Sequence, residues 1–144
     1  FESGNEEEFL HWMEQIHKKW GPADVVVLGG HGEPQKIQLG PGENEENFLD
    51  VTDDALERLR ELLKPGGILV LESCSTGDPK TTDNIARVIS EWTGTTVFAQ
   101  DQPINIKEFK FEYDENGKPH LVKIEYYEGP AEEYKGGERQ LKNR

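Results

Sequence analysis

The sequence predicts an α/β domain with a mainly parallel sheet and a C-terminal antiparallel β-hairpin. Apolar runs of strand length alternate with segments of helical periodicity, and a strong turn signal then lies between two stretches of alternating apolar and polar residues. Strands separated by helices pair in parallel, so their carboxyl ends meet along one edge of the sheet. With 144 residues, the chain has room for a single domain with a real core.

The first expected elements are a helix and a strand. Apolar residues recur at helical spacing from Phe9 to Trp20, behind a run of three glutamates that suits a helix N-terminus, and a Gly-Pro pair ends the helix. The apolar run Val25–Leu28 is the first strand. The stretch 32–47 is polar and rich in Gly and Pro, which favours an irregular functional loop.

A second helix and strand follow. Thr52 is the expected N-cap of this helix, and the sequence Pro-Gly-Gly from residue 65 is expected to stop it. The next strand then begins at Ile68. The buried stripe of the helix is expected to hold Leu56, Leu59 and Leu63.

A third helix and strand complete the parallel core. Thr81 or Thr82 is the expected N-cap, Gly94 closes the helix, and Thr95–Ala99 is the third strand. One helix face is expected to carry Ile85, Ile89 and Trp92.

The C-terminal part differs in character. Two alternating segments, Ile104–Tyr113 and Pro119–Tyr127, flank Asn116-Gly117 and predict a β-hairpin. From residue 128 onward the chain is charged and poor in apolar residues. The expected division is therefore a domain over 1–127 and a polar, mobile tail over 128–144.

Charge and composition exclude some classes of partner. Acidic residues outnumber basic ones by 29 to 16, for a net charge of −13, so nucleic acid and anionic membrane surfaces would be repelled and a basic substrate is favoured. No apolar stretch approaches the length of a membrane span. The lone cysteine excludes an intrachain disulfide, which leaves the compartment, cytoplasmic or secreted, open.

Two reactive side chains follow the first two predicted strands. His31 comes after one apolar run and Cys74 after the next. A cysteine nucleophile needs a neighbouring base, and a histidine at the adjacent strand end supplies one. A lone strand-end cysteine is often only a small buried apolar residue, and the matching histidine makes the catalytic interpretation the stronger one.

These motifs resemble those of the caspase-like cysteine peptidases, which include caspases, metacaspases, clostripain, gingipains and the self-cleaving domains of bacterial toxins. The resemblance rests on Val25–Gly32 (VVVLGGHG) and Ile68–Gly77 (ILVLESCSTG), with Cys74 43 positions after His31, and covers about residues 23–103. The segment 84–99 is most similar to the toxin-type and other bacterial members. The implied fold is a caspase-like three-layer sandwich.

The resemblance also implies roles for single residues. Cys74 would attack a peptide carbonyl, His31 would move the proton, and the backbone N–H groups of Gly32 and Cys74 would bind the oxyanion. No metal or cofactor is implied. In metacaspases an acidic residue two places before the cysteine binds a basic substrate residue, and Glu72 holds that position here. Asp101 could add a second negative charge, so cleavage of peptides or proteins after a basic residue is expected.

Self-cleavage and the wider context of the domain follow from the same resemblance. Lys135 and Arg139 offer basic sites within the expected tail. Family members usually have a further strand and helix before the His strand. The domain is therefore expected to be truncated at its N-terminus and to belong to a larger multidomain protein.

Two alternatives to an active peptidase remain. One is a caspase-like fold without activity that serves as an interaction module. The other is a fragment of a nucleotide-fold methyltransferase, because Leu62–Val70 (LLKPGGILV) is similar to a stretch of those enzymes. Such an enzyme needs a Gly-rich loop that opens a helix after its first strand, and the residues after His31 do not predict a helix.

Overall fold

The structure is a computed structural model that describes residues 3–41, 44, 47–51, 54–102, 106–126 and 131–141. These residues form an α/β fold with three helices and a mixed sheet that includes parallel strands, which confirms the α/β class predicted from the sequence. No helix in these ranges is long and apolar enough to cross a membrane.

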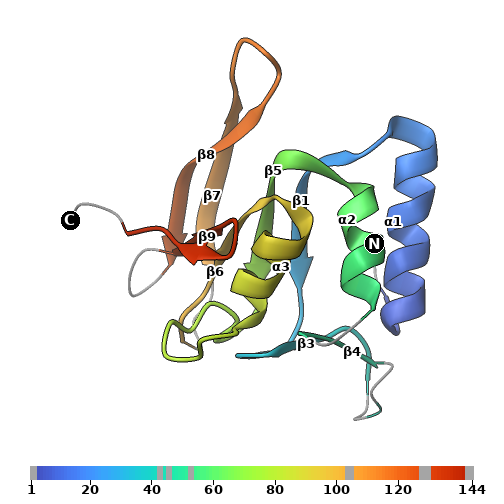
Figure 1. Cartoon of the computed structure of the whole chain (residues 1–144), viewed down its shortest axis with the longest axis vertical. Helices are drawn as coiled ribbons and strands as arrows, with labels where there is room; N and C mark the ends of the chain where they lie inside the picture. Colours follow the sequence, from blue (N-terminus) through green and yellow to red (C-terminus); the bar gives the residue numbers. More distant parts are fainter. Residues whose placement is uncertain are drawn as a thin grey trace.

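A five-stranded sheet in the order β1-β5-β6-β9-β10 forms the centre of the molecule (Figure 1). Three strands are parallel: β1 (Ala23–Gly29), β5 (Leu63–Glu72) and β6 (Thr96–Ala99). Next to them, β9 (Glu132–Lys135) runs antiparallel to β6 and β10 (Glu138–Arg139) turns back on β9. Because parallel strands end on the same side, the residues that follow β1, β5 and β6 lie along one edge.

The three helices pack on a single face of this sheet. They are α1 (Glu6–Trp20), α2 (Ala55–Leu62) and α3 (Ile85–Thr93), with α1 and α2 side by side (Figure 1). Their buried side chains share one apolar cluster with Leu69 and Leu71 of β5. The described residues therefore lack the second helical layer of the expected three-layer sandwich, because all three apolar stripes are used on this face.

The opposite face carries a hairpin instead of helices. Strands β7 (Ile106–Tyr113) and β8 (Pro119–Tyr126) are joined by the predicted Asn-Gly turn, where Gly117 has a φ of 74°. Phe111 of β7 packs against a second apolar cluster, which lies on this face of β5 and β6. The hairpin prediction is confirmed, and its expected ends Ile104 and Tyr127 lie outside the described residues.

The amphipathic pattern of α1 is confirmed, but the large aromatic residues near the helix ends are exposed. Asn5 caps α1 by accepting a hydrogen bond from a backbone amide of the first turn, and Phe9 and Met13 are buried. Trp20 is 69% exposed, and Trp92 of α3, expected on a buried face, is 42% exposed.

The stretch 32–47 was expected to be an irregular loop, and this prediction is wrong. It contains β2 (Gly32–Glu33) and β3 (Lys36–Gln38), which form a small antiparallel sheet with β4 (Phe48–Asp50). Ile37 of β3 is fully buried in the main apolar cluster. The stretch has only two aliphatic residues, Ile37 and Leu39, which are too few to give a periodic signal, although both pack in the core.

The second helix ends earlier than predicted. α2 ends at Leu62, and β5 begins directly at Leu63. The Pro-Gly-Gly stretch lies inside β5, at an irregularity in its register against β1, and Gly66 there has a φ of 77°, which suits glycine. The expected cap Thr52 lies outside the described residues.

The third helix is capped by a different residue from the one predicted. Asn84, rather than Thr81 or Thr82, occupies the N-cap of α3, and its side chain accepts a hydrogen bond of 2.9 Å from the Arg87 amide. Gly94 ends the helix in the left-handed conformation, as predicted.

Residues 132–139 form a hairpin of the sheet, β9 and β10, and are not a mobile tail. Tyr134 of β9 is fully buried, and the buried Glu132 carboxylate accepts two hydrogen bonds from Arg139, of 2.7 and 3.0 Å. The predicted tail over 128–144 is therefore wrong for these residues. One buried aromatic ring and one ion pair hold the short hairpin, and neither gives a pattern that predicts burial.

Candidate functional site

The register of β1 against β5 places His31 and Cys74 at equivalent positions. From Val25 to Gly29, each β1 residue pairs with a β5 residue 43 positions later, and 43 positions also separate His31 from Cys74. Each of the two residues lies two positions beyond the last paired residue of its strand. Both therefore lie at the same edge of the sheet, on neighbouring parallel strands.

The backbone after His31 lies directly against Cys74. A β-carbon built on Gly32 would lie 2.5 Å from the Cys74 carbonyl oxygen and 2.9 Å from its amide nitrogen. No side chain fits in that space, so only glycine allows this close approach. The contact brings the two segments together independently of the strand register.

The hydrogen bonds of β2 set the direction of the Gly32 amide. The Gln38 amide donates a hydrogen bond of 2.7 Å to the His31 carbonyl. His31 and Gln38 thus form a hydrogen-bonded pair. Hydrogen-bonded and non-hydrogen-bonded pairs alternate along an antiparallel ladder, so the next pair, Gly32 with Ile37, is a non-hydrogen-bonded pair. In that type the N–H points away from the partner strand, so the β2–β3 ladder does not use the Gly32 amide.

The two reactive side chains are both accessible. His31 is exposed and the Cys74 thiol is half-buried. Within the part of the chain that the structure describes, neither side chain takes part in a hydrogen bond or an ion pair. Both groups are therefore available to a bound molecule.

Two local irregularities flank Cys74. Ser75 has a φ of 58°, and among the described residues it alone is a non-glycine residue with positive φ. On the other side Ser73 is 2% exposed, and its hydroxyl has no hydrogen-bond partner among the described residues. A strained backbone of this kind costs about 1–3 kcal/mol and is concentrated at functional sites in proteins.

A carboxylate and a buried amide are neighbours at the same edge. Glu72 is exposed, and its Oε2 lies 3.8 Å from the place where a β-carbon of Gly29 would be, so its side chain extends across β1. Continuing the β5–β6 register sets Gln100 opposite Glu72. Gln100 is 2% exposed, and its Nε2 has no hydrogen-bond partner among the described residues. The Glu72 carboxylate can accept a cation, and the Gln100 N–H group can donate a hydrogen bond to an acceptor of the bound molecule.

Asp101 lies just beyond the end of β6. It is exposed, and its negative charge is the smallest of several influences that raise the pKa of Arg139, after the hydrogen bonds from Arg139 to Glu132. Arg139 belongs to β10, whereas Glu72 belongs to β5. Asp101 therefore contributes to the charge around Arg139, and its place beside Glu72 stays a prediction.

Other features near the site do not offer further reactive groups. Among the described residues, no group of three or more His, Cys, Asp or Glu could hold a metal ion. Glu33, close to His31 in sequence, forms an ion pair of 3.3 Å with Lys36. A groove of about 570 Å³ lies between α1 and β1, and no titratable side chain lines it, so it is unsuited to acid–base chemistry.

Three residues of this region were not singled out from the sequence. Gln100 and Asn84 are polar residues that are buried by tertiary contacts. The sequence pattern does not predict such contacts. Tyr134 could have been found, because a Gly-Gly pair at 136–137 follows it closely and Gly-Gly predicts a β-hairpin.

Comparison with known proteins identifies a family for most of the chain. Residues 4–108 match a family described as a domain of unknown function (DUF4347), a range that includes the ends of β1, β5 and β6. No curated protein and no solved structure matches the chain. Because the match extends over well more than half of the 144 residues, the chain belongs to the DUF4347 family, a domain of unknown function.

Proposed function

We propose that this domain is a cysteine endopeptidase of the caspase-like type, with Cys74 as nucleophile and His31 as its acid–base partner. The observation that supports the proposal most is the common offset of 43 residues, which holds for the β1–β5 pairs and for His31 and Cys74. The close approach of Gly32 to the Cys74 backbone supports it independently.

The proposed reaction has two steps. His31 takes the proton of the Cys74 thiol, and the thiolate attacks the substrate carbonyl carbon. As the tetrahedral intermediate collapses, the carbon–nitrogen bond breaks and His31 gives this proton to the leaving amine. Water, deprotonated by His31, then attacks the thioester and releases the acid product and the thiolate. The backbone N–H groups of Gly32 and Cys74 are the proposed oxyanion donors.

The strand order also supports a caspase-like fold. His31 follows the first parallel strand, Cys74 follows the second, and the antiparallel β9 lies beyond the third. The methyltransferase alternative receives no such support. The chain continues from β1 into β2 and β3, where such an enzyme needs a helix that opens at its cofactor loop.

The proposed substrate has a basic residue before the scissile bond. Glu72 is the residue proposed to bind it, because its carboxylate is exposed at the end of β5. An acidic substrate residue would be desolvated beside Glu72 at a cost. The net charge of −13 also favours the approach of basic peptides over acidic ones.

A panel of fluorogenic peptides tests the activity. We expect the wild-type protein to cleave after Arg or Lys, and we expect Cys74→Ala and His31→Ala to lower kcat at least a hundredfold. Iodoacetamide should modify Cys74 at neutral pH faster than it modifies a free thiol. If no peptide is cleaved and the thiol reacts no faster than a free one, the inactive interaction module is the better conclusion.

The variant Glu72→Gln tests the specificity. Removing the carboxylate charge while keeping the side-chain shape should lower kcat/KM for an Arg peptide about tenfold or more. The same variant should leave kcat/KM for a Leu peptide within about twofold. Glu33→Gln is the matched control, since Glu33 is also an exposed carboxylate and pairs with Lys36. Equal loss with both peptides would contradict the proposed role of Glu72.

A further inference from the structure

The turn that carries Cys74 is tied to the rest of the fold at several points. The Gly77 amide donates a hydrogen bond of 2.8 Å to the Gln100 carbonyl at the end of β6. The Ala86 amide of α3 donates to the Thr76 carbonyl at 3.1 Å. The turn therefore depends on its neighbours for its position.

A buried tyrosine hydroxyl also holds this turn, in addition to the hydrogen bonds from β6 and α3. Tyr134 of β9 is fully buried, and its hydroxyl donates a hydrogen bond of 3.0 Å to the Gly77 carbonyl. The Asn84 amide donates to the Tyr134 oxygen at 2.8 Å. The hydroxyl is thus used both as donor and as acceptor within the core.

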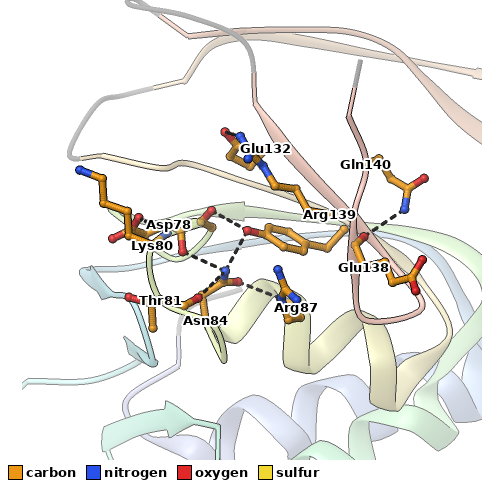
Figure 2. A network of polar contacts seen from close by, with 11 residues as sticks. Asp78, Lys80, Thr81, Asn84, Arg87, Glu132, Glu138, Arg139 and Gln140 are labelled. Carbon is orange, nitrogen blue, oxygen red and sulfur yellow. Dashed lines mark hydrogen bonds and ion pairs between the residues drawn. The ribbon is translucent and has the colours of Figure 1, made fainter. Parts of the chain in front are cut away.

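Asn84 links Tyr134 to the rest of the segment from Gly77 to Asn84. Its amide nitrogen also lies 3.0 Å from the Asp78 carbonyl and 3.2 Å from the Thr81 carbonyl. Figure 2 shows Asn84 between Asp78, Thr81 and Arg87, at the start of α3. The segment from Gly77 to Asn84 is therefore fixed around one side chain, and that side chain is bonded to Tyr134.

This tyrosine comes from a distant part of the chain. It lies 57 positions after Gly77 and 50 positions after Asn84. The Arg87 guanidinium lies 5.4 Å from the centre of its ring, and the ring belongs to the main apolar cluster. The ring secures the packing of β9, whereas the hydroxyl alone reaches the Cys74 turn.

We propose that Tyr134 is a positioning residue for Cys74. Its hydroxyl acts through hydrogen bonds to the Gly77 carbonyl and the Asn84 amide. This inference rests on the proposed peptidase function and adds to it a residue of the C-terminal hairpin. Among the described residues, the hydrogen-bond partners of the Tyr134 hydroxyl are Gly77 and Asn84 and not the thiol. This hydroxyl limits the motion of the turn that presents Cys74 to the substrate.

The variant Tyr134→Phe tests the proposal, because it keeps the buried ring and removes only the hydroxyl. Thr95→Val is the matched control. Thr95 is 1% exposed, its hydroxyl lies 2.8 Å from that of Thr93, and it precedes β6 at the end of the sheet opposite Cys74. Both variants lose one buried hydroxyl, but only the first loses contact with the turn.

Two measurements compare the variants. Hydrogen exchange measured by NMR should show the amides of Gly77, Asp78 and Ala86 exchanging about tenfold faster in Tyr134→Phe than in Thr95→Val. With the Arg peptide, kcat of Tyr134→Phe should fall about tenfold while KM stays within about twofold, because the turn spends less time in the reactive geometry.

The outcomes separate this inference from the proposed function. Equal exchange in the two variants overturns the positioning role, and so does faster exchange with an unchanged kcat. A wild-type protein that cleaves no peptide counts against the peptidase itself. The exchange comparison needs no substrate, so in that case it decides on its own whether the hydroxyl holds the turn.

Discussion

At the scale of single residues, Gly32 is the position where the site tolerates least change. A methyl group there would lie 2.5 Å from the Cys74 carbonyl oxygen and 2.8 Å from the Ser73 β-carbon. One of the two backbones must then move. We expect Gly32→Ala to lower the rate of Cys74 alkylation at neutral pH at least tenfold and to reduce the free energy of unfolding by about 1–3 kcal/mol, as urea denaturation would measure.

Gly94→Ala provides the control for this substitution. Gly94 has a φ of 70° and no atom within 4 Å of a built β-carbon, so alanine there adds backbone strain without a clash. It should cost about 1 kcal/mol and leave the alkylation rate unchanged, because it ends α3 away from the Cys74 turn. Loss of thiol reactivity in both variants would mean that the loss follows stability and not the contact at Gly32.

At the scale of elements, β9 is anchored by a tyrosine whose ionisation opposes folding. Burial raises the pKa of the Tyr134 hydroxyl above its ordinary value of 10.0, and the Asn84 hydrogen bond offsets part of this. As the pH rises, the unfolded chain releases this proton before the folded protein does. The stability contributed by the neutral hydroxyl is therefore complete below about pH 10 and is lost as the pH rises through the raised pKa.

The difference in stability between wild type and Tyr134→Phe should follow that rule. At pH 7 the substitution should lower the free energy of unfolding by about 1–2 kcal/mol, because buried polar groups lose their partners. The difference should shrink above pH 10, as measured by urea denaturation from pH 7 to 11. Tyr113→Phe, a substitution at a residue that is 60% exposed, should change the free energy of unfolding little at any pH. A constant difference across the range would contradict the assigned burial of the phenol.

The elements that could be predicted from the sequence are those with a repeating pattern. The apolar run of β5 and the helical spacing in α1 and α3 each involve several residues, so neighbouring positions support the same prediction. In contrast, β3 and β9 each depend on one fully buried side chain, Ile37 and Tyr134. A single burial of this kind is decided by tertiary contacts.

The same distinction applies to the site. His31, Glu72 and Cys74 follow apolar runs, so the strand pattern itself points to them. Asn84 and Gln100 become notable only through what they contact or fail to contact in the folded chain. Asp101 also follows a strand, β6, and its charge contributes to the raised pKa of Arg139, so its role beside Glu72 stays a prediction.

At the scale of the whole molecule, the C-terminal hairpin bears on self-cleavage. Lys135 pairs with Thr96 of β6, and the two glycines that follow it turn the chain with φ angles of 60° and 81°. Arg139 holds the buried carboxylate of Glu132. Cleavage after Lys135 or Arg139 would therefore require the hairpin to leave the sheet, which exposes the buried Tyr134.

We therefore expect no self-cleavage at these two bonds in the folded protein. A concentrated wild-type sample incubated for days should keep an intact mass equal to its calculated value, as should Cys74→Ala, because opening the hairpin costs several kcal/mol and leaves few molecules susceptible at any time. Mass spectrometry checks this directly. Fragments ending at Lys135 or Arg139 that form in the wild type and not in Cys74→Ala would mean that the hairpin opens readily. In that case β9 would be a substrate of the site as well as a support for the turn that carries Cys74.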